Sequence, residues 1–214
     1  MAKPTTAPAF YDLHPSVAYV QAVLANFKAK TGRTLEAWVA FARKEGPAEA
    51  KARLAWLKTQ GLGTNQAGFV LQRAGAAPGH VFDDTPEGYL AAAPRHVDSQ
   101  YGGRKAALRP LFEQAVVLAR SLGDDVKVCP CETIVPFYRN HVFVFAEVKP
   151  FVARLDLGLA LGDPATVKDA SGRLKDTGGF AKKDRITHKV ELACEADLRL
   201  ALPWLKRAYE RDGG

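Results

Sequence analysis

Residues 154–161 read Arg-Leu-Asp-Leu-Gly-Leu-Ala-Leu, and this alternation decides the fold class of the C-terminal half. Successive side chains of a β-strand point to opposite faces, so the four leucines share one face and Arg154, Asp156, Gly158 and Ala160 share the other. A strand of this kind buries one face and leaves the other facing water, as strands of antiparallel sheets do.

Further short strands surround this segment, because other stretches are β-branched or alternate in the same way. They are residues 126–128, 133–138, 141–148 and 185–192, and the central strand itself is predicted over residues 152–161. Arg139-Asn140 and Lys149-Pro150 are tight connections, which indicates an antiparallel meander. Residues 104–122 and 195–211 have helical periodicity, and we expect Pro203 to kink or split the second helix. The pattern predicts an α+β domain over residues 104–211, with its N- and C-terminal helices covering one face of the sheet.

The N-terminal half is helical instead. Apolar residues recur at helical spacing in segments 15–30, 35–44, 47–60 and 65–74, and Thr34 and Thr64 precede two of these segments as N-cap residues. These helices predict a small bundle over residues 15–75.

The turn Gly61-Leu62-Gly63 between the last two helices is typical of a helix-turn-helix. In that motif the second helix enters a DNA groove, so Thr64, Asn65, Gln66 and Arg73 would face the bases. Lys58 on the preceding helix would then hold a phosphate. The alternative is purely structural, because any compact helical bundle contains such turns.

Charge separates the segments of the chain. Residues 1–80 contain ten Lys and Arg against four Asp and Glu, whereas residues 81–100 contain one against four, and the whole chain has a net charge of +7. The excess of cations in the helical half is typical of a protein with a polyanionic partner, although many basic proteins bind nothing acidic.

Residues 76–103 are predicted to form an acidic linker rich in Gly, Pro and Ala, with a short helix only at 86–93. Residues 1–14 are predicted to form a disordered or extended arm.

A second basic surface is predicted in the C-terminal half. Its members come from loops and strands that we expect to share one sheet face: Arg139, Lys149, Arg154, Lys182, Lys183, Arg185 and His188. Phe137, Tyr138, Phe143 and Phe145 are close in sequence and would stack on bases, as in single-strand binders, although we expect most of them in the core.

One catalytic alternative has the right residue order. Asp125 precedes Glu147-Val148-Lys149, and restriction-type nucleases use an acidic residue followed by Glu-x-Lys to hold Mg²⁺ and polarise a water molecule. Against it, Lys149 adjoins Pro150 in an apparent hairpin turn, where exposed charges are ordinary. We assign no other catalytic residue.

Only three cysteines occur, Cys129, Cys131 and Cys194, which argues against a secreted disulfide framework. Cys129-Pro130-Cys131 with Cys194, His141 or His188 is a weak zinc pattern, so we expect packed or free thiols, no metal and no cofactor. No stretch approaches the roughly 20 apolar residues of a membrane span, and the expected location is the cytoplasm.

Two families share motifs with this chain. Residues 31–38 and 61–67 resemble a short helical domain of unknown function in uncharacterised bacterial proteins. Residues 101–111, 154–159, 187–188 and 205–209 resemble an α+β domain of unknown function. Relatives of the second domain occur alone, or appended to predicted nucleases and to proteins loosely labelled as transport-related. The resemblance implies no catalytic residues, since none are assigned in either family.

The sequence therefore predicts a two-domain, non-enzymatic binding protein with DNA or RNA as its partner. One alternative is the Mg²⁺-dependent nuclease. The other is an adaptor for a protein or a small ligand, and a pocket between the leucine-rich sheet and its helices would favour the small-ligand adaptor. A protein partner or a homo-oligomer is also compatible with the sequence.

Overall fold

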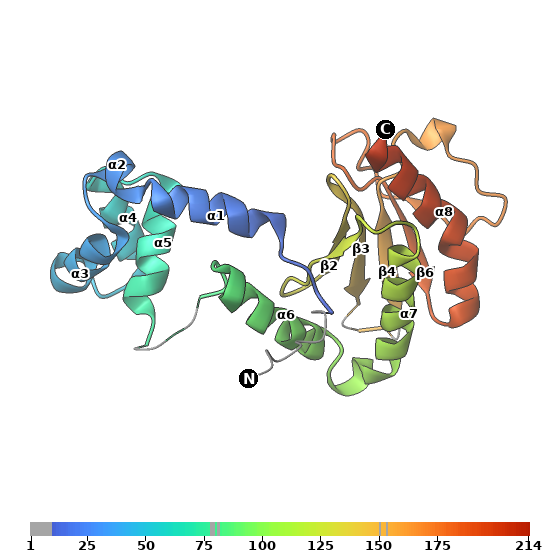
Figure 1. The fold of residues 1–214 in the computed structure, drawn as a ribbon, viewed down its shortest axis with the longest axis horizontal. Helices are drawn as coiled ribbons and strands as arrows, with labels where there is room; N and C mark the ends of the chain where they lie inside the picture. Colours follow the sequence, from blue (N-terminus) through green and yellow to red (C-terminus); the bar gives the residue numbers. More distant parts are fainter. Residues whose placement is uncertain (1–9, 78–79, 81, 150, 153) are drawn as a thin grey trace, which may run out of the picture. The chain divides into compact units, whose positions relative to one another are not determined.

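The computed structural model describes residues 10–77, 80, 82–149, 151–152 and 154–214 (Figure 1). Residues 15–88 form one compact unit, and residues 10–14 join residues 89–214 in a second. The fold class is α+β, as predicted: a helical bundle precedes an antiparallel sheet covered by helices.

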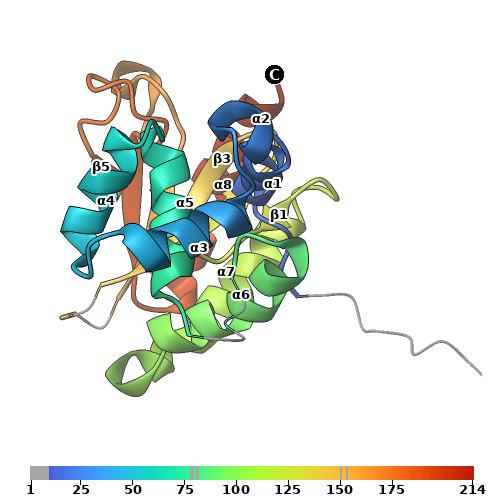
Figure 2. The same cartoon turned by 90° about the vertical axis from the view of Figure 1, so that its left-hand side faces the viewer.

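The described residues 15–77 of the N-terminal unit form five α-helices, which are labelled in Figure 2. They are α1 (Pro15–Ala25), α2 (Phe27–Thr31), α3 (Leu35–Glu45), α4 (Ala50–Thr59) and α5 (Thr64–Gly75). Helices α3 and α4 both pack on α5. Phe27, Trp38, Leu57 and Val70 are at most 5% exposed in the core between them. Burial of these side chains, at about 25 cal/mol per Å² of apolar area, holds the short helices together.

The helix ends follow the sequence closely. Thr34 accepts a hydrogen bond from Ala37 N at 3.2 Å and caps α3, as predicted. Gly63 rather than Thr64 is the N-cap of α5, so Thr64 is the first residue of that helix. Gly61 has a φ of +95° in the turn between α4 and α5, a conformation that favours glycine. Helix, glycine-containing turn and helix thus follow one another as the motif requires.

The C-terminal unit contains a six-stranded antiparallel sheet with the order β1-β2-β3-β4-β6-β5. The strands are β1 (Lys127–Val128), β2 (Val135–Tyr138), β3 (Val142–Val148), β4 (Leu155–Leu159), β5 (Lys175–Asp176) and β6 (His188–Leu192). The short strand β5 is not among the strands predicted from the sequence.

The register gives the two sheet faces opposite characters. Leu157 of β4 pairs with Ala146 of β3 and Val190 of β6, and Leu155, Leu157 and Leu159 are fully buried. Helices α7 (Arg109–Arg120) and α8 (Glu195–Gly213) lie side by side against the sheet and bury this leucine face (Figure 1). On the other face, Asp156 pairs with Glu147 and Glu191.

Three helices differ from the prediction. Residues 86–100, placed in the linker, form helix α6 (Pro86–Gln100), which continues past Pro94 and buries Ala93 and Val97 completely. The helix expected from residue 104 begins as a 3₁₀ helix, Gly103–Leu108, before α7. Helix α8 runs through Pro203 without splitting, and Pro203 itself is exposed. Apolar burial on either side of both prolines compensates for the hydrogen bond that each removes.

The described part of the N-terminal arm is extended and lies on the C-terminal unit. Asp12 N donates to Val128 O at 2.8 Å, and Arg120 donates to the Asp12 carboxylate at 2.7 Å. Tyr11 is only 6% exposed. The remainder of the predicted arm, residues 1–9, lies outside the described residues.

Candidate nucleic-acid interface

The basic residues expected on one sheet face are divided among three places. Lys149 and Arg154 flank the β3–β4 connection, whereas Lys182, Lys183 and Arg185 precede β6. His188 is 3% exposed on the leucine face and its ring contacts Thr187 Oγ1 at 2.8 Å. Burial lowers the pKa of His188, so this residue is a neutral core histidine and the expected surface position is wrong.

The aromatic residues are divided as well. Phe137 and Phe143 are completely buried, so neither is able to stack on a base, whereas Tyr138 and Phe145 keep some exposure. The Tyr138 hydroxyl contacts His14 Nε2 at 3.1 Å.

Carboxylates neutralise the cations on the open sheet face. Asp156, with a side chain 2% exposed, receives Arg154 at 2.8 Å, Lys189 at 3.4 Å and Lys149 at 4.0 Å. Glu191 pairs with Lys175 at 2.7 Å and with Arg154 at 3.2 Å. Lys149 and Arg154 thus form ion pairs with carboxylates on the sheet face. Because their charges are already neutralised, they are poorly placed to bind phosphates.

The opposite end of the sheet meets the last turn of α8. Asp212, whose side chain is 1% exposed, accepts a hydrogen bond from His141 N at 2.8 Å and an ion pair from Arg185. Arg139 donates to Tyr209 O at 3.2 Å and to the Asp125 carboxylate at 2.7 Å. Cations at the carboxyl end of a helix also interact favourably with its dipole.

Beside this turn lies a pocket of about 550 Å³ that is lined by three cations and one carboxylate. Its walls come from three separate segments: the turn before β6, the loop after β4, and the end of α8. They are Gly162, Phe180, Ala181, Lys183, Asp184, Arg185, Thr187 and Arg211, which we call the α8-end pocket.

The turn before β6 sets the position of Lys183. Asp184 N donates to Gly179 O at 2.8 Å and Lys183 N to Phe180 O at 3.1 Å, so the turn is closed by its own backbone. Lys183 has a φ of 61°, which non-glycine residues adopt at a cost of about 1 kcal/mol. Phe180 in the same turn is 48% exposed. An aromatic ring and a cation therefore face solvent from one turn.

The two arginines of the pocket lie close together. A Cβ on Gly162 would lie 2.8 Å from Arg211 Nε, so the glycine gives Arg211 room beside the sheet. Burial and the neighbouring Arg211 lower the pKa of Arg185. The two positive charges repel each other, and an anion bound between them would reduce this repulsion.

Carboxylates balance only part of this charge: Asp212 pairs with Arg185, and Asp184 also lines the pocket. Within the described part of the chain, Lys182, Lys183 and Arg211 have no ion-pair partner, whereas Arg139 and Arg185 each have one. The pocket region thus has an excess of positive charge beside an exposed aromatic ring. This combination suits a nucleotide, whose phosphate would contact the cations and whose base would stack on the ring.

The three residues of the nuclease alternative do not come together. Glu147 and Lys149 pair at 2.6 Å near the end of β3. Asp125 is bound by Tyr209 at 2.7 Å and by Arg139, which precedes β3. The length of β3 therefore separates the two carboxylates by roughly 20 Å. The acidic neighbour that Glu147 does have, Asp156, is already surrounded by cations.

The cysteines lie in two places. Cys129 is buried and Cys131 is partly buried, whereas Cys194 is exposed as the N-cap of α8. Burial raises the pKa of Cys129 to about 12 and also raises that of Cys131, which keeps both thiols protonated. Among the described residues, no group of three or more His, Cys, Asp or Glu is arranged to hold a metal ion.

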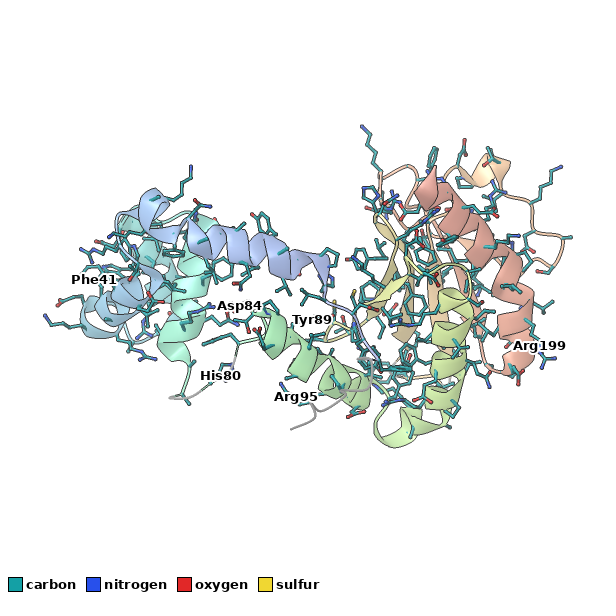
Figure 3. All side chains as sticks on the ribbon, viewed as in Figure 1. Phe41, His80, Asp84, Tyr89, Arg95 and Arg199 are labelled. Carbon is teal, nitrogen blue, oxygen red and sulfur yellow. The ribbon has the colours of Figure 1, made fainter. Side chains whose placement is uncertain are left out.

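In the N-terminal unit, the proposed DNA-reading residues are partly available. Lys58, Thr64 and Asn65 are exposed and Gln66 is half-buried. Asn65 Nδ2 lies 3.4 Å from the Tyr19 hydroxyl. Arg73 instead forms an ion pair with Asp84 at 2.5 Å, with both side chains largely buried (Figure 3 labels Asp84). Arg73 therefore fastens residues 82–84 to α5 and is not free to contact a base.

Two residues that give the α8-end pocket its chemistry, Phe180 and Arg211, were not predicted from the sequence. Phe180 is an aromatic residue in a segment otherwise rich in Gly, Lys and Asp, and that contrast was a usable signal. Arg211 had no signal, because only the folding of α8 onto the sheet brings it beside Arg185.

Comparisons with known proteins define the two domains without assigning a role. A family model described as Domain of unknown function (DUF5655) matches residues 97–212, and one described as Domain of unknown function (DUF4287) matches residues 20–72. No curated protein and no solved structure matched the chain. None of the helices in the described part combines the length and apolar character that crossing a bilayer requires.

Proposed function

For a chain that belongs to the DUF5655 family, we propose a non-enzymatic function: it binds single-stranded nucleic acid at the α8-end pocket. A phosphate lies between Lys183, Arg185 and Arg211, and the neighbouring base stacks on Phe180. The observation that carries the proposal is the convergence of three cations from two separate segments, the turn before β6 and the end of α8, on a pocket with an exposed aromatic ring.

The charge of the surrounding surface supports this proposal. Lys182 lies in the same turn as Lys183 and is exposed, so it extends the positive surface along the path of a nucleic-acid backbone. Three other cations of the predicted basic surface, Arg139, Lys149 and Arg154, are paired with carboxylates and take no part. A single-stranded partner is favoured over a duplex because a base must leave its stack to reach Phe180.

The experiment is fluorescence anisotropy of labelled single-stranded RNA, single-stranded DNA and duplex DNA against the full chain, across a salt series. We expect the single strands to bind, with log affinity falling linearly in log salt. Arg211→Ala should weaken binding severalfold and reduce the salt slope by about 0.7, the value for one phosphate contact on a single strand.

Lys206→Ala is the matched control, because Lys206 lies on the same helix, is exposed, and pairs with Glu210 at 3.8 Å outside the pocket. It removes the same unit of charge, so equal weakening by both variants would show a nonspecific charge effect and contradict the proposal. Failure of every probe to bind at low salt would contradict it as well.

A further inference from the structure

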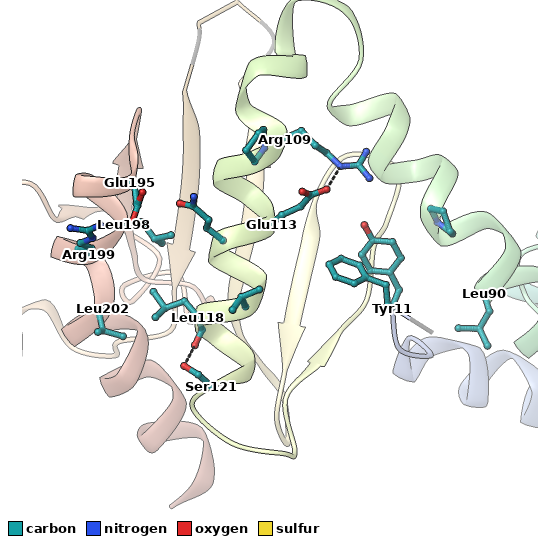
Figure 4. A pocket seen from close by; sticks show the side chains of 15 residues that line it. Tyr11, Leu90, Arg109, Glu113, Leu118, Ser121, Glu195, Leu198, Arg199 and Leu202 are labelled. Carbon is teal, nitrogen blue, oxygen red and sulfur yellow. Dashed lines mark hydrogen bonds and ion pairs between the residues drawn. The ribbon is translucent and has the colours of Figure 1, made fainter. Parts of the chain in front are cut away.

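A second surface of the C-terminal unit is apolar and lies over α7 (Figure 4). It is a groove of about 1150 Å³ whose lining comes from residues 10–11, α6, α7 and α8, and we call it the α7 groove. Leu198 and Leu202 of α8 lie on one side of α7, and Tyr11 and Leu90 lie on the other.

Exposed apolar side chains concentrate here. Four of the ten large hydrophobic residues that are exposed in the described chain line the groove: Phe10 (50%), Leu90 (38%), Val117 (65%) and Leu202 (36%). Monomeric proteins seldom expose contiguous apolar patches of this kind without an interaction partner.

The shape of the groove favours a protein over a small ligand. Small-molecule sites bury most of the ligand surface in a concave cavity. Val117, however, is the most exposed of the four apolar residues named above. The outer side of α7 and its C-cap presents a stripe of residues at helical spacing: Pro110, Gln114, Val117 and Ser121. The small side chains of Val117 and Ser121 lie at one end of this stripe. A second helix fits against such a stripe.

The charges of the groove identify the kind of partner. The chain has a net charge of +7, but the charged residues of the groove are two cations and two anions. Arg109 pairs with Glu113 at 2.9 Å, and Arg199 pairs with Glu195 at 2.5 Å. A polyanion finds no excess positive charge here. An identical surface meets it without net repulsion, since a two-fold interface places the same patch on both subunits.

We propose that the α7 groove is the interface of a homodimer, in which α7 of one copy packs against α7 of a second copy around Val117. Phe10, Leu90 and Leu202 flank this contact and become buried. The inference is independent of nucleic-acid binding, because none of these residues lines the α8-end pocket.

The test is sedimentation velocity of the full chain, freed of nucleic acid by nuclease and high salt, from about 1 µM to about 200 µM, the range of weak to moderate association. We expect a concentration-dependent dimer. Val117→Asp should raise the dissociation constant at least tenfold, and Leu202→Asp is a second groove variant with the same expected effect.

Leu200→Asp is the matched control, because Leu200 is 51% exposed on α8 but does not line the groove. It should leave the dimer intact. Thermal unfolding checks that each variant is folded, which we expect since these side chains are exposed. A monomer over the whole range, or equal dissociation by Leu200→Asp and the groove variants, would overturn the proposal.

Discussion

At the scale of one residue, Lys183 combines an unusual backbone conformation with a place in the proposed binding site. Among the described residues it is the non-glycine residue with positive φ, and it lines the α8-end pocket. Strained backbone of this kind persists where the position of a side chain matters more than local stability. The fold gives Lys183 no carboxylate partner in the described chain, so its ammonium group remains available for a ligand.

Lys183→Asn should separate stability from binding. Asparagine tolerates left-handed backbone better than lysine, so we expect the free energy of unfolding to stay unchanged or rise by up to about 1 kcal/mol. Binding of single-stranded nucleic acid at low salt should nevertheless fall severalfold. Urea unfolding and anisotropy on the same preparation measure both quantities. An unchanged affinity would remove Lys183 from the site.

At this scale the sequence predicted a basic surface, and the structure brings together only some of the residues expected there. Lys182, Lys183 and Arg185 are consecutive or nearly so, and the turn keeps them together. His188 follows them closely in sequence, but strand alternation in β6 turns it into the core. Arg139, at the β2–β3 connection, contacts the end of α8 and pairs with Asp125 rather than lining the pocket. Pairing between strands and contacts with α8 decide these placements, and neither is visible in local sequence.

At the scale of elements, α8 packs on the sheet and its last turn lines the α8-end pocket. Asp197 stabilises the first turn of this helix. The Asp197 carboxylate receives Arg173 at 2.6 Å, Ala193 N at 2.7 Å and Cys194 N at 3.2 Å. The Arg173 hydrogen bond, followed by these backbone donors, lowers the pKa of Asp197 to about 2. The ionised carboxylate is therefore stabilised by folding.

Asp197→Asn should lower the free energy of unfolding at neutral pH by about 1–2 kcal/mol. The folded pKa lies below the unfolded value of 3.8, so this stabilisation is present above about pH 4 and is lost as the pH falls toward 2. Urea unfolding at pH 7 and pH 2.5 measures the difference.

Glu195→Gln, in the same turn but with an exposed side chain, should cost much less. A difference between Asp197→Asn and the wild-type chain that persists undiminished at pH 2.5 would contradict this assignment.

Helices and strands with strong periodicity were predictable, whereas elements that depend on tertiary contacts were not. The leucine alternation of β4 and the N-cap Thr34 follow from local sequence. Helix α6 was predicted only up to Pro94, because a proline usually ends a helix and the burial of Val97 beyond it is a tertiary contact. Strand β5 has two exposed residues and no pattern to recognise.

At the scale of the whole molecule, the C-terminal unit has two surfaces of different chemistry. The α8-end pocket is cationic and the α7 groove is neutral and apolar. The proposed dimer would have two of the proposed phosphate-binding pockets, so we expect a strand long enough to reach both to bind with higher avidity than to one copy. The N-terminal unit contributes exposed Lys58, Thr64 and Asn65, whose contact with DNA remains a prediction.

Photo-cross-linking of single-stranded RNA containing 4-thiouridine to the full chain, followed by tryptic mass spectrometry, tests the central claim most directly. The account predicts a cross-link at Phe180, in the tryptic peptide of residues 176–182, that disappears in Phe180→Ala and persists in Tyr19→Ala, the variant of another exposed aromatic residue. Cross-links confined to the N-terminal unit or to the α7 groove would contradict it.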